Sequence, residues 1–237
     1  MEWFRDNFSH IAELTGYHLV QAILPLVLGV AIAVPVAQAA RLNKALAGVI
    51  LTTSALLYTV PSLAMFVLLP IVLGTRVLDM VNVIVALTIY AVALLVRSTL
   101  DALNSIDDGV RQAAVAMGFS PLRRFLTVDL PLSIPVLFAG LRVISVTNIS
   151  LVSVGALIGI PSLGTLFTDG LQRNFPTVIV IGILVTLVLA LVMDLLLVLL
   201  ERVLTPWVRK SGTRTEAITT TVHADPSTHV SRTEAGA

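Results

Sequence analysis

The sequence contains no cysteine and few charged residues. Of its 237 residues, 12% are charged and 57% are hydrophobic, and the mean hydropathy is +0.97. An ordinary soluble domain is about one quarter charged, so this chain has too little polar surface to coat a water-soluble globule. The lack of cysteine excludes disulfides, thiolate catalysis and zinc sites with cysteine ligands. The composition therefore excludes a soluble enzyme and predicts a membrane protein.

An excess of charge and the residue patterns of catalysis are also missing. The net charge is +1 at pH 7, which gives no basic face for a nucleic-acid partner. Neither lysine, Lys44 or Lys210, has the preceding glycine and following serine or threonine of an ATP-binding P-loop. The histidines lie outside the apolar runs or at their edge: His10, His18, His223 and His229. We expect no metal site, no cofactor and no enzymatic activity in this chain.

Five apolar runs are long enough to cross a membrane, which takes about 20 mostly apolar residues in a helix. The runs show no alternation of apolar and polar residues, so helices are favoured over strands. They cover residues 18–40, 46–73, 81–96, 132–158 and 177–200. Pro61 should kink or break the second run, which is then one bent span or a span followed by a re-entrant segment. The predicted fold class is an all-α polytopic membrane protein with about five transmembrane helices.

The positions of the basic residues predict how the spans are oriented, because cytoplasmic loops are enriched in lysine and arginine. One set of flanks holds Arg41, Lys44, Arg97, Arg111, Arg123, Arg124, Arg202, Arg209, Lys210, Arg214 and Arg232. The opposite set holds only Arg5, Arg76 and Arg173. With five spans, this bias places the N-terminus outside the cell and the C-terminus in the cytoplasm.

The chain divides into three parts by composition. Residues 1–17 form an extracytoplasmic N-terminal segment, and residues 18–207 form the transmembrane domain with a cytoplasmic loop at 101–130. Residues 208–237 are rich in threonine, serine and alanine and have almost no large apolar side chains. We expect this last segment to be a disordered cytoplasmic tail. A metal site built from its histidines is the alternative.

Two ionisable residues, Arg142 and Asp194, fall inside the fourth and fifth runs. Charges within a bilayer are costly and are usually paired or functional. At 1.5 Å per residue they lie roughly 16 and 10 Å from the cytoplasmic edge, so their depths are similar. We predict that they form an ion pair or share a polar cluster between the two helices. A packing role is favoured over a substrate site.

The polar segment between the third and fourth runs contains the start and stop signals of two short helices. Ser105 can cap a first helix, with acidic residues in its first turn, and Gly118 can end it. Ser120 followed by Pro121 can begin a second helix. Such an amphipathic pair either lies in the membrane interface or docks in a groove on a soluble partner.

The same segment resembles the EAA loop of ABC importer permeases. The resemblance rests on Gln112-Ala113-Ala114, then Gly118, then Leu130-Pro131, with glutamine where the family has glutamate. In that family the loop forms coupling helices that sit in a cleft of a cytoplasmic ATPase. The resemblance implies an ATPase contact made by Gln112, Ala113, Ala114, Met117, Gly118, Phe119, Arg123 and Arg124.

Other stretches are similar to the osmoprotectant branch of these permeases. They are Val60-Pro61-Ser62-Leu63-Ala64, Tyr90-Ala91, Ala116-Met117-Gly118-Phe119 and Asp129-Leu130-Pro131-Leu132. The resemblance implies a type I ABC importer permease in a bacterial cell membrane that moves glycine betaine, choline, carnitine or related quaternary ammonium compounds. It also implies several partners: a second permease subunit, identical or similar, cytoplasmic ATPase subunits that bind ATP and magnesium, and an extracytoplasmic binding protein.

A path for the solute is harder to locate, because only 5% of the residues are aromatic and quaternary ammonium groups are usually held by aromatic rings. The candidates are Tyr58, Pro61, Ser62, Phe66 and Tyr90. Core packing is the competing interpretation for the aromatic ones. An importer of the same class for an amino acid or another small polar solute, and an ion-coupled secondary transporter, are the alternative functions.

Overall fold

The computed structural model describes residues 2–208, and these form helices joined by turns, with no strand. The helices are α1 (Glu2–Asp6), α2 (Phe8–Leu42), α3 (Lys44–Thr59), α4 (Ser62–Leu73), α5 (Met80–Asn104), α6 (Asp108–Ala116), α7 (Pro121–Arg124), α8 (Leu130–Gly155), α9 (Thr165–Gln172) and α10 (Pro176–Leu204). A π-helical turn, η1 (Phe125–Asp129), precedes α8, and a 3-10 turn, η2 (Ala156–Ile158), follows it. The predicted all-α class is confirmed. The expected tail and its histidines lie outside the described residues, except for Val208.

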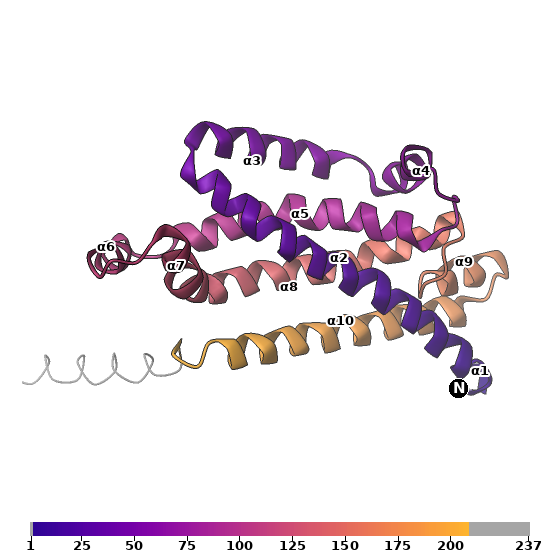
Figure 1. The fold of residues 1–237 in the computed structure, drawn as a ribbon. Coiled ribbons are helices and arrows are strands. Elements are labelled where there is room, and N and C mark those ends of the chain that lie inside the picture. The colour runs from indigo at the N-terminus through magenta and orange to yellow at the C-terminus, as the bar shows by residue number, and fades with distance from the viewer. Residues whose placement is uncertain (1, 209–237) are drawn as a thin grey trace, which may run out of the picture.

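Long helices run side by side along the length of the molecule (Figure 1). α5 lies at the centre and packs against α2, α3, α4 and α8, while α10 packs against α8 and α9. α6 and α7 lie beyond one end of the long helices, and α1, α4 and α9 lie at the opposite end (Figure 1). The basic residues that the sequence analysis expects on the cytoplasmic side lie near the α6–α7 end, which we call the inner end. We call the opposite end the outer end.

Four segments are long and apolar enough to span a membrane on their own. They are α2, α5, α10 and a continuous helical segment from Pro121 to Ile158 that includes α8. α3 and α4 meet the criterion together, and they are bent by 102° where they join. The described part of the chain therefore contains four or five spans, as its apolar runs predict.

The bend between α3 and α4 shows how the second apolar run is interrupted. Val60 and Pro61 have extended backbone conformations, with ψ of 128° and 132°. Proline has no backbone N–H to donate, so the helical hydrogen bonding stops there. The hydroxyl of Tyr90 donates to the carbonyl oxygen of Val60 at 2.8 Å and thereby satisfies an acceptor that the break has freed. α3 follows the long helices, whereas α4 turns across the outer end (Figure 1).

Small side chains allow α2 to lie close to its neighbours. Ala33, Ala37 and Ala40 recur on one face of α2, and all three are completely buried. In membranes such small residues bring helix backbones together, where packing rather than hydrophobic burial favours association. Around them, the buried side chains of α5 and α8, such as Leu95 and Phe138, complete a core that extends along the bundle.

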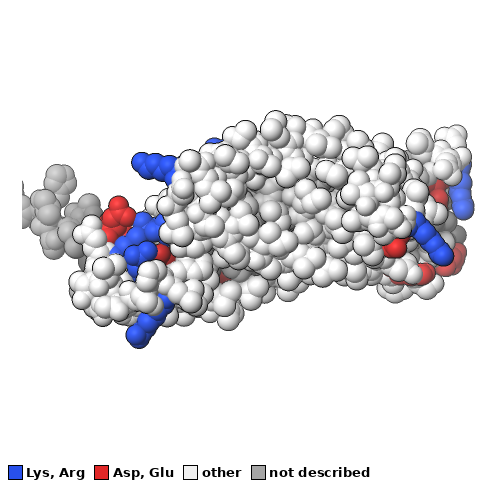
Figure 2. Space-filling view, turned by 45° about the horizontal axis from the view of Figure 1, so that its top comes forward, with Lys and Arg blue, Asp and Glu red and all other residues white. Residues whose placement is uncertain are grey.

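The outer surface of the bundle is apolar along its middle. On the face shown in Figure 2, the charged side chains gather toward the two ends, and the zone between them is almost free of charge. α10 contributes many exposed large apolar side chains to the molecule's surface, among them Leu187, Leu191 and Leu195. This distribution suits a bundle whose middle contacts lipid or another apolar helix and whose ends contact water.

Candidate functional site

The α6–α7 pair projects beyond the inner end of the long helices (Figure 1). Asp107 caps α6, and its side chain accepts a hydrogen bond from the backbone N–H of Gly109 at 2.7 Å. The sequence-based expectation that Ser105 is this cap is wrong, because α5 continues to Asn104 and Ser105 instead donates to the carbonyl oxygen of Ala102. Gly118 follows α6 with φ of +79°, a left-handed conformation that favours glycine.

The start of α7 follows the predicted pattern. The Ser120 hydroxyl accepts a long hydrogen bond from the N–H of Arg123, at 3.4 Å, and Pro121 occupies the first helical position. From there η1 and α8 continue the same helical segment into the bundle without a break. α7, η1 and α8 therefore form one continuous helical segment.

The expected coupling residues divide into an outward and an inward set. Gln112, Ala113, Met117, Gly118 and Arg123 are exposed, whereas Ala114 is buried. The guanidinium of Arg123 lies 4.5 Å from the centre of the Phe119 ring, a cation–π contact.

Apolar side chains on the same two helices also project into the surroundings: Val110, Val115, Met117 and Leu122. Monomeric soluble surfaces rarely gather such apolar groups without a partner. The pair thus extends beyond the long helices and presents an apolar surface with the exposed Arg123 beside it.

Arg124 points away from this surface, toward a buried carboxylate that the sequence pattern alone did not single out. Asp129 is completely enclosed, and its Oδ2 atom lies 3.1 Å from Nη1 of Arg41 and 3.6 Å from Nε of Arg124. Its Oδ1 atom lies 3.5 Å from Nε of Arg111. Arg111 also bonds Asp108 and donates to the carbonyl oxygen of Leu103. We call Asp129 with Arg41, Arg111 and Arg124 the arginine joint.

The arginine joint connects helices that are far apart in the sequence. Arg41 lies at the end of α2, Arg111 lies on α6 and Arg124 lies on α7, while Asp129 itself precedes α8. A buried charge is tolerated only when it is paired, so the four side chains constrain one another's positions. The arrangement holds the α6–α7 pair to the inner ends of α2 and α8. The nearest sequence signal is an isolated acid directly before Leu130-Pro131, with arginines in the same polar segment and in the flank after the first apolar run.

The structure brings Arg142 and Asp194 together. Nε of Arg142 donates to Oδ1 of Asp194 at 2.6 Å, and a terminal guanidinium nitrogen, Nη2, donates to Oδ2 at 2.7 Å. Two parallel bonds of this kind make a short, charge-assisted pair with a fixed orientation. The pair joins α8 to α10.

The candidate path residues fall in different surroundings. Tyr58 and Tyr90 meet edge to face, with ring centres 6.0 Å apart, beside the break at Pro61. Tyr90 is only 3% exposed and Phe66 is completely buried, so both pack in the core of this chain. Tyr58, Pro61 and Ser62 lie closer to the surface.

His18 lies inside α2 and is completely buried, not at the edge of a span as the sequence suggests. The reason is that the polar residues after Phe8 already belong to the same helix. Nδ1 of His18 accepts a hydrogen bond from the N–H of Leu163 at 3.3 Å, so Nε2 is left to donate to the carbonyl oxygen of Ile149 at 3.1 Å. Gln21 donates to the carbonyl oxygen of Pro161 at 2.8 Å. Together they fix the turn after α8 against α2.

A bundle of four or five apolar spans with a helix pair projecting at one end is the architecture of a polytopic membrane protein. Residues 26–209 match the family described as binding-protein-dependent transport system inner membrane component, and the chain belongs to this family. It is therefore a multi-pass membrane protein and a transporter subunit, not an enzyme. Membership implies partners of two kinds, an ATPase and a substrate-binding protein.

Similar proteins cover nearly the whole chain. The osmoprotectant import permease protein OsmW of Salmonella typhimurium is 34% identical over 209 residues, which are 87% of this chain and 97% of that protein. The carnitine transport permease protein OpuCD of Listeria monocytogenes is 26% identical and matches 92% of this chain and 97% of its own length.

Solved structures resemble the fold as well. A chain of the MetNI methionine ABC transporter, in an inward-facing conformation, superposes with a TM-score of 0.70 at 20% identity, over 82% of this chain and 96% of that one. A chain of an amino acid ABC transporter gives a TM-score of 0.67 at 18% identity, over 81% and 92%. These likenesses confirm the expected importer-permease fold.

Proposed function

We propose that this chain is the permease subunit of an ATP-driven, binding-protein-dependent importer of osmoprotectants such as glycine betaine, choline or carnitine. The observation that supports the substrate class is its similarity, over most of its length, to permeases described as transporting osmoprotectants, carnitine and choline. The projecting α6–α7 pair and the absence of a P-loop in the chain support dependence on a separate ATPase.

The exposed surface of α6 and α7 is the proposed ATPase contact. Its apolar side chains, with Gln112 and Arg123 beside them, would fill a cleft on the nucleotide-binding partner, and Gly118 would allow the sharp turn between the two helices. Gln112 retains hydrogen bonding but carries no charge, so the contact at this position is polar and not ionic. Two ATPase subunits would contact two permease subunits, which are identical or similar to each other.

The arginine joint is the proposed link between this contact and the spans. When nucleotide closes the ATPase dimer, α6 and α7 move together, because Arg111 and Arg124 share the carboxylate of Asp129. Through the continuous segment from Pro121 the motion reaches α8, and through Arg41 it reaches α2. Tilting of these helices would open the path toward the outer end, and hydrolysis would reset it.

The path itself is proposed to pass the exposed side of the α3–α4 bend, near Tyr58, Pro61 and Ser62. Phe66 and Tyr90 support the bend from the core. Arg142 and Asp194 hold α8 and α10 as one unit that moves with the coupling helices. Substrate selection would reside mainly in the binding protein, because the described chain offers no aromatic cage.

Uptake by purified complex in vesicles tests this function. We expect glycine betaine, choline or carnitine to accumulate only when ATP and the binding protein are both supplied, and we expect ionophores to leave uptake unchanged. Accumulation of an amino acid instead would show that the chain serves an importer of the same class with another substrate. Uptake that collapses with ionophore and ignores ATP depletion would identify a secondary transporter and contradict the proposal.

A further inference from the structure

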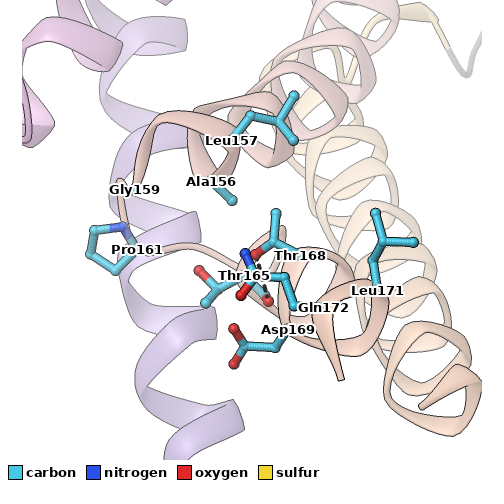
Figure 3. A pocket seen from close by; sticks show the side chains of 9 residues that line it. All are labelled: Ala156, Leu157, Gly159, Pro161, Thr165, Thr168, Asp169, Leu171 and Gln172. Atoms are coloured by element: carbon cyan, nitrogen blue, oxygen red, sulfur yellow. Dashed lines mark hydrogen bonds between the residues drawn. The ribbon is translucent and has the colours of Figure 1, made fainter. Parts of the chain in front are cut away.

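A hollow of about 490 Å³, lined by both polar and apolar side chains, opens at the outer end, between η2 with the turn that follows it and α9. Thr165, Asp169 and Gln172 line one side of it, and Gly159 and Pro161 line the other. In Figure 3 the side chains of Thr165 and Asp169, one helical turn apart, lie together on the side of α9 that faces Pro161. The hollow is distinct from the coupling helices, which are at the opposite end of the molecule (Figure 1).

The wall that contains Pro161 is held in place before any ligand arrives. Gln21 bonds the carbonyl oxygen of Pro161, and His18 bonds the N–H of Leu163. The N–H of Ser162 donates to the Thr165 hydroxyl at 3.3 Å, which ties this wall to α9. A preformed site loses little conformational entropy when it is filled.

The chemistry of the hollow is that of a cation site. Within residues 2–208 the carboxylate of Asp169 has no ion-pair partner and accepts no hydrogen bond. No basic residue is among the lining residues, and the amide of Gln172 adds a further acceptor. A carboxylate at such a site recognises a group that carries positive charge and N–H donors.

A quaternary ammonium solute fits this site less well than a basic side chain does. Such a solute has no N–H to donate, and it is bound best by aromatic faces. The lining residues include no aromatic ring. Lysine and arginine, in contrast, can reach a carboxylate and an amide oxygen at the same time.

We propose that Asp169 and its hollow receive a lysine or arginine side chain of the extracytoplasmic binding protein. This inference rests on the proposed function, because it assumes that a binding protein docks at the outer end. It identifies Asp169 as the anionic contact that orients the docked protein over the outer end of α8 and α9. Charge pairs at such interfaces steer encounter and fix register, and removing one partner of an enclosed pair also weakens binding.

The experiment titrates glycine-betaine-loaded binding protein against the reconstituted complex and measures stimulation of ATP hydrolysis. We expect Asp169→Asn to raise the half-stimulating concentration about tenfold while basal hydrolysis stays unchanged. Asp169→Glu keeps the charge, so its half-stimulating concentration should stay close to that of the wild type. The wild type should also lose stimulation as salt rises, and Asp169→Asn should lose less. Asp6→Asn removes another exposed outer-end carboxylate and serves as the matched control.

An unchanged half-stimulating concentration in Asp169→Asn would overturn the inference, as would an equal shift in Asp6→Asn. The variant Asp169→Arg reverses the charge of this contact. If an acidic substitution at one basic residue of the binding protein restores stimulation of the Asp169→Arg complex, that basic residue is the partner side chain. A change in solute affinity with no change in the binding-protein titration would place solute in the hollow and overturn the inference. A wild-type complex that no osmoprotectant-binding protein stimulates would contradict the proposed function and this inference with it.

Discussion

Asp129→Asn is expected to reduce ATP-driven uptake by about tenfold or more, as changes within a coupled network can. The substitution preserves the shape of the side chain and removes the one carboxylate within residues 2–208 that contacts Arg41, Arg111 and Arg124 together. Breaking a buried ion pair by removing one partner costs about 3–5 kcal/mol. The cost here falls toward the lower end of that range, because the arginines are partly exposed and Arg111 keeps its pair with Asp108. We expect α6 and α7 to lose their fixed position relative to α2, so that hydrolysis continues without transport. Parallel assays in the same vesicles measure the ratio of solute taken up to ATP hydrolysed.

Asp108→Asn is the matched control for this prediction. Asp108 pairs with the same Arg111, at 2.7 Å, but its side chain is 82% exposed. An exposed pair contributes little, so we expect uptake and stability close to those of the wild type. Equal effects of the two substitutions would show that the buried position of Asp129 is not what matters. Full transport by Asp129→Asn would show that transport does not require the arginine joint.

Gly164→Ala is expected to destabilise the folded protein by about 3 kcal/mol, near the upper end of the usual cost of overpacking. A Cβ atom at Gly164 would lie 2.2 Å from the carbonyl oxygen of Ser153 and 2.8 Å from its Cα atom. Both are backbone atoms of α8, so no side-chain rotation relieves the clash. The strain would fall on the turn that His18 and Gln21 hold, at the outer end.

Thermal unfolding of the purified protein in detergent measures this effect, and Gly16→Ala is its control. Gly16 lies within α2, and a Cβ atom there would meet nothing within 4 Å. Alanine favours a helix over glycine by about 1 kcal/mol, so Gly16→Ala should leave stability equal or higher. A Gly164→Ala protein as stable as the wild type would show that α8 and the turn do not pack as closely as described.

The spans could be predicted because they depend on local composition. Apolar runs of sufficient length report directly on membrane-crossing helices, and Pro61 marked the break between α3 and α4. Arg142 and Asp194 could be paired because each was a lone charge in an apolar run at a similar depth. In each case one or two residues stood out against their own surroundings.

The remaining features depend on which distant segments meet. Asp129 stands directly before Leu130-Pro131, but this local signal does not show that Asp108 is exposed while Asp129 is buried. Its importance follows from Arg41, which lies 88 positions away in the sequence. The burial of His18 likewise depends on backbone groups 131 and 145 positions away. Ser105 was misassigned because a helix end is set by the competition of neighbouring caps, and Asp107 prevailed.

The most direct test of the central claim is a site-specific cross-link from α6 to the ATPase. The chain has no cysteine, so Met117→Cys introduces a unique thiol. Met117 is 68% exposed at the inner end, and Leu157, at the outer end, is 65% exposed and provides the control Leu157→Cys. With a short thiol-reactive cross-linker, we predict that Met117→Cys is joined to the ATPase subunit and that Leu157→Cys is not. A Met117→Cys protein that transports solute but gives no cross-link to an ATPase would contradict the account.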